Sequence, residues 1–304
     1  MKVAILITCH NRKEKTLRCI ASLHEAIAKY NETLIGSEGY ITAELFLTDD
    51  GCTDGTAEAV SIQCSTFNLL CHIISGDGSL FWAGGMRLAW QEAINRNQGW
   101  NYYLLINDDT ILQTDAFNTL LSAQNYCLDT YGRLGIVSGI TCATDNAAEI
   151  TYGGEVFTNR LTGRRRLLHP TGSPQLCDWA HANALLVPGE VAMKHGILYE
   201  GYRHGQADLD YSYRARRRGI PVVVTAKVCG CCNYDHPSIT AIGQQLCAMT
   251  LKERRAYLNH PLHSDADYLL MTRRCMPVKY PLTWVFRKLN LYTPYLYYRL
   301  NQKR

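Results

Sequence analysis

The chain has 304 residues, of which 47% are hydrophobic, and a formal net charge of +4 at pH 7. This composition is ordinary for a globular protein that buries its own core without help from metals or disulfides. A net charge this small does not by itself indicate a nucleic-acid partner. No window reaches the roughly 20 apolar residues of a membrane span. The short apolar run at the N-terminus predicts a buried strand and not a secretory signal.

Thirteen cysteines are scattered along the chain without a framework spacing. Scattered cysteines in a chain of this size indicate reduced thiols, so we expect a cytoplasmic protein. The cluster Cys229-Gly230-Cys231-Cys232 suggests zinc, but structural zinc usually takes a second cysteine pair, which the sequence lacks. Buried thiols at a strand end are therefore the favoured interpretation.

The first third of the chain alternates short apolar runs with amphipathic segments. The runs predict strands at residues 3–8, 43–47, 69–74 and 102–106, and the segments between them predict helices at 15–30, 54–63 and 84–95. Apolar strands that alternate with helices are typical of a mostly parallel sheet covered by helices on both faces. We therefore expect an α/β fold.

Beyond residue 134 the pattern changes. Strands are expected at residues 135–140, 149–158, 177–187 and 222–226, a turn at Arg164-Arg165-Arg166, and a helix at 209–218. Some of these strands are expected to be antiparallel. No repeat or linker divides the chain, so we predict one domain over residues 1–245, with halves at 1–112 and 113–245. Residues 246–304 are predicted to form a helical extension.

Polar, acidic or glycine-rich segments follow the first four predicted strands. They are residues 8–12 (TCHNR), 48–56 (TDDGCTDGT), 75–79 (SGDGS) and 107–109 (NDD). Turns explain any one of these segments, because Asp and Gly are common in turns. Ligands of parallel sheets bind beyond the carboxyl ends of the strands. Four such segments at one edge therefore favour a binding site.

Asn107-Asp108-Asp109 follows a buried strand that fixes its position. A sugar nucleotide carries a diphosphate whose charge must be neutralised as it leaves, and a divalent cation held by one or two carboxylates does this. We predict Asp109 as a ligand of Mn²⁺ or Mg²⁺, with Asn107 and Asp108 contacting the sugar nucleotide. A turn or helix cap is the alternative. His236 is a candidate second metal ligand, with a solvated loop histidine as the alternative.

Asp50 lies at the tip of the second predicted strand. Its carboxylate is suited to accept a hydrogen bond from a pyrimidine N–H or a ribose hydroxyl. This favours sugar nucleotides of uridine or thymidine over those of guanosine. Asp54 is better explained as the cap of the following helix.

Residues 8–12, 49–56 and 107–109 together resemble the family 2 glycosyltransferases, in which these segments form the nucleotide half of the glycosyltransferase-A fold. Residues 207–216 (ADLDYSYRAR) are similar to the family's Glu-Asp-x-Asp-x-x-x-Arg segment. The resemblance implies that Asp208 is the catalytic base and that the anomeric centre is inverted. Ala207 replaces the family's glutamate.

Four further residues are candidates for contacting the sugar nucleotide. Thr8, His10 and Arg12 of the first segment are expected to contact the sugar nucleotide. Arg87 lies one position after the arginine of the family's Ala-Arg-Asn segment, and it is assigned a diphosphate contact or else an exposed helix face.

Three residues are candidates for binding the acceptor. Trp179 and His181 are assigned to it because an aromatic ring with polar neighbours suits a sugar face; a core tryptophan and a satisfied histidine are the alternatives. Asp210 is a third candidate, with an ion pair to Arg214 one turn later as the alternative.

These residues favour a single displacement, in which Asp208 removes the proton of an acceptor hydroxyl while Asp109 and its metal stabilise the departing nucleoside diphosphate. Two other functions stay open. A sugar-nucleotide nucleotidyltransferase typically has a glycine-rich loop after its first strand, and residues 8–12 contain no glycine. A non-catalytic, membrane-associated nucleotide-binding protein would be expected to lack the base, and Asp208 is present.

The last part of the chain is basic and aromatic, with no acidic residue after Asp267. Basic residues mixed with Trp and Tyr favour the interface of an anionic bilayer. A tail packed on the core with a solvated basic face is the alternative. We expect peripheral contact with the inner face of the plasma membrane and a polyprenyl-linked saccharide acceptor, as in bacterial surface polysaccharide synthesis.

Overall fold

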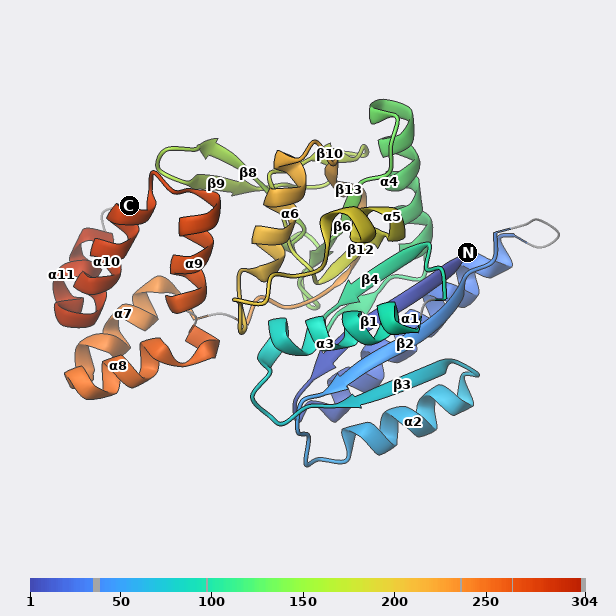
Figure 1. The fold of residues 1–304 in the computed structure, drawn as a ribbon, viewed down its shortest axis with the longest axis horizontal. Coiled ribbons are helices and arrows are strands. Elements are labelled where there is room, and N and C mark those ends of the chain that lie inside the picture. Colours follow the sequence, from blue (N-terminus) through green and yellow to red (C-terminus); the bar gives the residue numbers. More distant parts are fainter. Residues whose placement is uncertain (35–38, 97, 236, 264, 302–304) are drawn as a thin grey trace.

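The computed structural model describes residues 1–34, 39–96, 98–235, 237–263 and 265–301. Its main body is a ten-stranded mixed sheet with helices on both faces, and a group of C-terminal helices lies beside it (Figure 1). The predicted α/β fold, with a largely parallel sheet and a helical C-terminal region, is confirmed.

Four parallel strands, in the order β3-β2-β1-β4, form one side of the sheet. With their connecting helices they are β1 (Lys2–Cys9), α1 (Lys13–Glu32), β2 (Thr42–Asp49), α2 (Thr56–Thr66), β3 (Leu70–Ser75), α3 (Phe81–Asn95) and β4 (Tyr102–Ile106). Every strand and helix predicted in this part is confirmed, with ends shifted by at most three residues.

The continuous apolar run of β1 is explained by two hydrophobic clusters, one on each face of the sheet. Val3, Ile5 and Ile7 pack into the cluster that includes α1, α2 and α4. Ala4 and Leu6 pack into the cluster that includes α3 and α6. Because successive side chains of a strand point to opposite faces, a strand buried on both faces has no polar alternation.

The other side of the sheet is mixed. Its elements are β5 (Ile111–Leu112), α4 (Ala116–Tyr131), β6 (Ile136–Cys142), β7 (Ile150–Tyr152), β10 (Gln175–Leu176), β12 (Ala184–Pro188), α5 (Gly189–His195), α6 (Ala207–Arg217) and β13 (Val222–Cys231). Strand β12 lies antiparallel between β4 and β6, so the start of β12 meets the end of β4. This reversal brings residues 180–184 to the edge where β1, β2 and β4 end.

A separate three-stranded sheet holds β8 (Gly154–Asn159), β9 (Arg164–Leu167) and β11 (Trp179–Ala180). The turn predicted at Arg164-Arg165-Arg166 is wrong, because these residues form β9. Arg165 pairs with Glu155 on β8 at 2.9 Å, and its guanidinium lies over the ring of Trp179. The turn lies just before, at Gly163, whose φ is +67°.

Two further predictions differ from the structure. The strand expected at residues 149–158 is divided at Gly153, whose φ of +150° interrupts the extended backbone. The strand expected at 177–187 is divided into β11 and β12, which belong to different sheets. Helix α4 was not predicted.

The C-terminal helices are α7 (Ile239–Ala248), α8 (Leu251–Asn259), the 3₁₀ helix η1 (Pro261–His263), α9 (Asp265–Cys275), α10 (Tyr280–Tyr292) and α11 (Pro294–Asn301). The boundary predicted at residue 245 lies inside α7. Asp267 of α9 joins the helices to the main body by accepting the backbone N–H groups of residues 203–205. Within the described residues, no helix is both long and apolar enough to cross a membrane.

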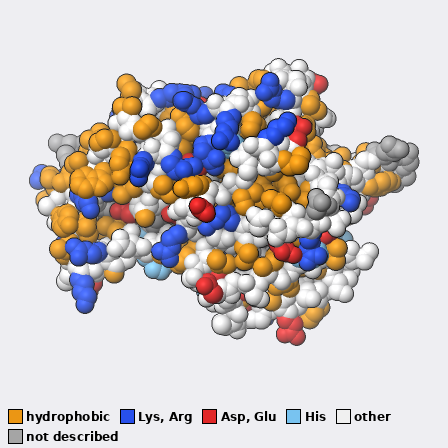
Figure 2. Space-filling view, in the orientation of Figure 1, with side chains coloured by type: hydrophobic (Ala, Val, Ile, Leu, Met, Phe, Trp, Pro, Cys, Tyr) orange, Lys and Arg blue, Asp and Glu red, His pale blue; other side chains and the backbone are white. Residues whose placement is uncertain are grey.

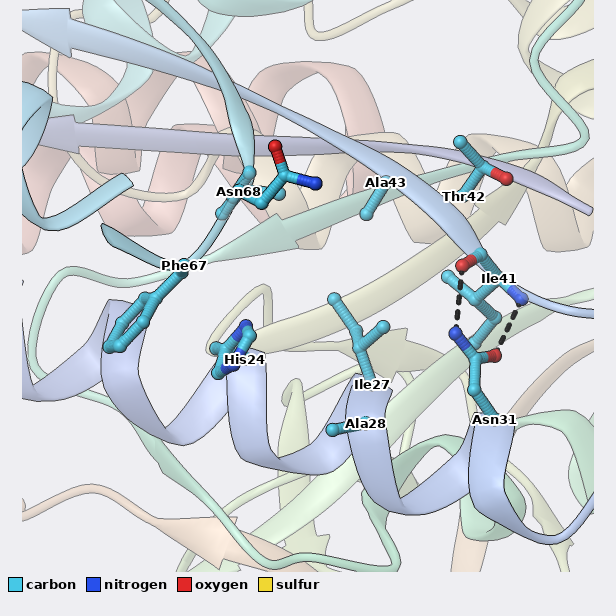
Figure 3. A pocket seen from close by; sticks show the side chains of 10 residues that line it. His24, Ile27, Ala28, Asn31, Ile41, Thr42, Ala43, Phe67 and Asn68 are labelled. Atoms are coloured by element: carbon cyan, nitrogen blue, oxygen red, sulfur yellow. Dashed lines mark hydrogen bonds between the residues drawn. The ribbon is translucent and has the colours of Figure 1, made fainter. Parts of the chain in front are cut away.

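A pocket of about 280 Å³ lies between α1 and the amino-terminal ends of β2 and β3. Figure 3 shows Asn31 bonded to both backbone groups of Ile41 at one end of this pocket, and His24 beside Phe67 at the other. The pocket is therefore at the opposite end of the strands from the predicted binding segments, and we assign it no part in the site.

Helix α3 approaches β1 closely at Gly85. A Cβ atom on Gly85 would lie 2.0 Å from Oγ1 of Thr8, whereas one on Gly84 would lie 3.2 Å from its nearest neighbour, Cβ of Leu80. Close contact between backbone and side chain therefore fixes the start of α3 over the end of β1.

We expect Gly85→Ala to lower the free energy of unfolding by about 1–3 kcal/mol, because the added methyl overpacks this contact. The matched variant Gly84→Ala is expected to be neutral or slightly stabilising, since it gains helix propensity with a milder contact. Urea denaturation measures both. Equal effects of the two variants would contradict the proposed close approach.

Candidate active site

The polar segments that follow β1, β2, β3 and β4 lie at one edge of the sheet. The register pairs Cys9 with Asp49 and Asp49 with Ser75, so the three strands end level with one another. The N–H of Asp50 donates to the carbonyl of Cys9, and the N–H of Gly76 donates to the carbonyl of Asp49. The structure therefore brings together the segments that the sequence suggested.

Arg12 pairs with both carboxylates of the acidic segment after β4. Its Nη1 lies 3.1 Å from Oδ1 of Asp108, and its Nη2 contacts Oδ2 of Asp109. Burial raises the pKa of Asp108 to about 7, although the guanidinium of Arg12 opposes this shift. The sequence predicted Arg12, Asp108 and Asp109 as site residues, and the structure makes them one charged cluster.

The cluster suits a divalent cation by its donor type, since Mn²⁺ and Mg²⁺ prefer carboxylate oxygens. Asp109 also lines a pocket of about 140 Å³ with Lys15, Arg18 and Asp235, among others. The described residues include no group of three or more His, Cys, Asp or Glu side chains arranged around a metal. A cation completed by substrate phosphates needs only one or two carboxylates. His236, the second predicted ligand, lies outside the described residues.

Asp50 supports the backbone of the segment before α3. Its Oδ1 accepts the N–H of Gly78 at 2.9 Å and that of Leu80 at 3.3 Å, and its Oδ2 accepts the N–H of Phe81 at 2.9 Å. Asp50 therefore supports this loop, and because Oδ2 accepts one of the two hydrogen bonds open to it, the nucleotide contact stays a prediction. The preference for a pyrimidine base, which depends on Asp50, likewise stays a prediction.

Three other residues that were predicted to contact the nucleotide are in contact with other parts of the protein. Thr8 is buried against Gly85. His10 is exposed, and its Nδ1 lies 2.6 Å from the carbonyl oxygen of Asp50. Arg87 donates to the carbonyls of Tyr199 and Tyr202 at 3.1 and 2.7 Å, so its guanidinium holds the loop before α6.

Asp208, the predicted base, lies in the first turn of α6, and short contacts connect it to the acidic segment. Its Oδ2 accepts the N–H of Ala182 at 3.1 Å. The next residue, Asn183, accepts the N–H of Asn107 on its carbonyl oxygen at 3.4 Å. Asp208 and Asn107, which are 101 positions apart, are therefore separated by two residues of the segment before β12.

A second set of contacts connects the same two segments on another side. The indole Nε1 of Trp82 donates to Oδ1 of Asn107 at 2.8 Å, and its backbone N–H lies 3.5 Å from Nδ1 of His204. His204 belongs to the loop that leads into α6 and Asp208. Trp82, His204, Asp208, Ala182–Asn183 and Asn107 thus form a closed ring, which we call the site ring.

Burial raises the pKa of Asp208 above the ordinary range of an aspartic acid, and the neighbouring His181 opposes that shift. His181 is partly buried, with its ring near that of Tyr152. Of the three predicted acceptor residues, His181 is the one that the structure places beside Asp208.

The other two predicted acceptor residues are buried. Trp179 is 1% exposed and packs edge-on against Phe157, so its side chain belongs to the core and not to an acceptor surface. Asp210 is fully buried, and its oxygens accept Nε–H of Arg214 at 2.7 Å and of Arg274 at 2.9 Å. The pairing with Arg214 that the sequence left open is therefore formed, and Asp210 holds α6 to α9.

Trp82 and Asn183 were not predicted as site residues. An aromatic residue in the segment after a glycine-rich strand end was a weak signal for Trp82. The position of Asn183 depends on the antiparallel pairing of β12 with β4, which sequence periodicity does not show.

Comparison with known proteins agrees with this geometry. Residues 4–131 match the family model described as Glycosyl transferase family 2. A search of curated proteins found no match. The matched residues include the three acidic or polar segments after β1, β2 and β4, so this part of the chain is similar to the family 2 glycosyltransferases.

Solved structures show the same fold at low sequence identity. A mannosyltransferase from Pyrobaculum calidifontis, in complex with GDP-Man and Mn²⁺, is 13% identical with a TM-score of 0.53, over 96% of this chain and 81% of that one. S. aureus TarS residues 1–349 are 12% identical with a TM-score of 0.53, over 96% and 75%. GalNAc-T7 with UDP, GalNAc and Mn²⁺ is 13% identical with a TM-score of 0.56, over 76% and 43%. These identities establish the glycosyltransferase-A fold alone.

We expect Arg12→Met to raise the affinity of the free protein for Mn²⁺ by about tenfold, which corresponds to about 1.4 kcal/mol. The guanidinium occupies the two carboxylates that the cation would bind, so its removal frees them. Titration of Mn²⁺ followed by electron paramagnetic resonance measures the affinity. Lys29→Met, which removes an exposed positive charge at the far end of α1, is the control. Unchanged or weaker binding in Arg12→Met would contradict the competition.

Proposed function

We propose that the protein is an inverting, metal-dependent glycosyltransferase that transfers a sugar from a nucleoside-diphosphate sugar to a hydroxyl group of a saccharide acceptor. The site ring supports this proposal, since it places one half-buried carboxylate, Asp208, near a pair of carboxylates at the end of β4. A base and a charged leaving-group site are the two parts that such a displacement needs.

In this reaction the carboxylate of Asp208 takes the proton of the acceptor hydroxyl. The acceptor oxygen forms a bond to the anomeric carbon, and the bond from that carbon to the phosphate oxygen breaks with its electron pair. The nucleoside diphosphate leaves, and attack from the opposite side inverts the anomeric centre. A divalent cation held by Asp109, with Asp108 beside it, would supply positive charge to the leaving diphosphate.

Basic groups near Asp109 are suited to the same diphosphate. Lys15 and Arg18 of α1 line the 140 Å³ pocket that Asp109 shares. Arg12 would be available for a phosphate oxygen if a divalent cation took its place on the carboxylates. The protein thus offers three cationic side chains from one helix and its preceding loop.

The acceptor that we propose is a lipid-linked saccharide in the synthesis of a bacterial surface polysaccharide, because the C-terminal helices are basic and aromatic. Measurement of the released product tests the reaction class. A panel of UDP, dTDP and GDP sugars is expected to release nucleoside diphosphate. Release of pyrophosphate from a sugar phosphate and a nucleoside triphosphate would indicate a nucleotidyltransferase instead. Absence of turnover with every donor and acceptor would indicate a non-catalytic binding protein.

We expect Asp208→Asn to lower kcat by about 10²–10⁴-fold, because the amide cannot accept the proton. Binding of the nucleoside diphosphate, measured by calorimetry, is expected to stay within about threefold, since Asp208 lies outside the diphosphate site. Asp129→Asn on the exposed side of α4 is the control for the change of charge. A variant with normal turnover would exclude Asp208 as the base.

The pH dependence of turnover gives an independent test. A base must be ionised, so kcat/KM falls as the pH decreases through the pKa of Asp208. Because burial raises this pKa, the acidic limb of the profile is expected above the ordinary value of about 3.9. His181→Ala removes a group that lowers this pKa, so the limb is expected at still higher pH. A shift of the limb to lower pH in His181→Ala would contradict the assignment.

A further inference from the structure

Helix α10 is oriented with polar residues toward the protein and apolar residues toward solvent. Thr283 and Asn290, seven positions apart, are buried. On the other side Leu282, Trp284 and Val285 are exposed. A helix packed on the surface of a globular protein normally shows the opposite arrangement. The outward side of α10 is therefore a surface for contact with something other than water.

The exposed surface continues before and after α10. We define the apolar face as the exposed apolar residues of the segment from the end of α9 to α11, namely Val278, Leu282, Trp284, Val285, Tyr292, Tyr295 and Leu296. Val278 is 80% exposed and Tyr295 is 63% exposed. Figure 2 shows hydrophobic side chains gathered over these C-terminal helices. A contiguous patch of this kind marks an interaction site more often than a free surface.

Positive charges accompany the apolar face. Nζ of Lys288 lies 5.2 Å from the ring centre of Trp284, and the guanidinium of Arg299 lies 5.7 Å from that of Tyr295. Lysine and arginine beside tryptophan and tyrosine are the residues that prefer the headgroup region of a bilayer. The composition therefore suits an anionic membrane surface.

The acidic residues of the C-terminal helices do not offset this charge. The described residues from 239 onward include three acids, and each is used elsewhere. Asp265 pairs with Arg287 at 2.6 Å, Asp267 accepts N–H groups of the loop before α6, and Glu253 forms the capping box of α8 with Thr250. The apolar face thus lies in a surface of positive charge.

We propose that the apolar face docks on an anionic lipid bilayer, with its aromatic and aliphatic side chains in the headgroup region and Lys288 and Arg299 on the phosphates. A second copy of the chain fits less well, because a two-fold contact would bring these cations close to their own copies without acids to pair with them. The amphipathic helix with a basic rim is the arrangement by which peripheral proteins bind such surfaces.

Docking would also orient the candidate active site. Helix α9 precedes the apolar face. Its Asp267 binds the loop before α6, and its Arg274 binds Asp210 of α6. Asp208 is in the first turn of the same helix. The bilayer contact is therefore rigidly connected to the helix that carries the proposed base. The docking proposal itself stands independently of the transfer reaction.

Vesicle binding tests the proposal directly. The full-length protein is expected to sediment with vesicles of phosphatidylcholine and phosphatidylglycerol in equal parts at 50 mM salt, and much less with phosphatidylcholine alone. Leu282→Ser combined with Val285→Ser and Tyr295→Ser is expected to weaken binding at least tenfold. All three side chains are exposed, so their replacement leaves the core intact. Lys288→Gln with Arg299→Gln is expected to weaken binding and to reduce its dependence on salt.

The matched control is Ile62→Ser with Met193→Ser, which removes two exposed apolar side chains from α2 and α5. It is expected to bind as the unaltered protein does. Failure of the full-length protein to bind anionic vesicles, or equal binding by the triple variant, would overturn the proposal. If light scattering shows that the unaltered protein is a dimer and the triple variant a monomer, the apolar face joins two copies instead. Turnover of a soluble nucleotide sugar, measured in parallel, separates a failure of membrane binding from a failure of the proposed transfer reaction.

Discussion

Two adjacent carboxylates at the end of a buried strand set the constraint around which this site is built. Asp108 and Asp109 follow β4, where burial penalises the ionised form of Asp108 and like charges repel. In the structure Arg12 supplies the opposite charge. A ligand that replaces Arg12 must therefore bring positive charge, unless Asp108 takes up a proton. This requirement is one reason for proposing that a diphosphate with a divalent metal binds at this edge of the sheet.

The acidic residues of the candidate site divide into those that we propose take part in the reaction and those that hold its parts in place. Asp50 fixes the start of α3, which presents Trp82 to Asn107. Asp210 and Arg274 fix α6, which presents Asp208. Each oxygen of both carboxylates accepts at least one hydrogen bond from the protein. Pre-organisation of this kind keeps the reacting groups in position without help from the substrate.

The sequence predicted well what depends on local patterns. The four parallel strands, and the polar segments after them, follow from hydrophobic periodicity and from the rule that such sheets bind ligands at their carboxyl ends. The closeness of Arg12 to Asp109 follows from the same rule. Asp208 was assigned as the base by its resemblance to a family segment, and that role stays a prediction.

Long-range contacts were not predictable in the same way. The partners of Asp50 lie 28–31 positions later, and an isolated Asp at a strand tip looks the same whether it binds a ligand or a loop. Trp179 was assigned to the acceptor because its neighbours are polar, yet the three-stranded sheet buries it. The composition of residues 268–304 indicated a membrane contact, but the periodicity did not show that α10 turns its polar residues inward.

The most direct test of the central constraint is a crystal structure of the protein with Mn²⁺ and a nucleoside diphosphate. The expected result is Mn²⁺ bound to Asp109 and to phosphate oxygens, Arg12 moved from the carboxylates toward the diphosphate, and Asp208 facing an open space for the sugar and the acceptor. A nucleotide bound away from the carboxyl ends of β1 and β4, or bound there with Arg12 still paired to both carboxylates and no metal, would contradict it.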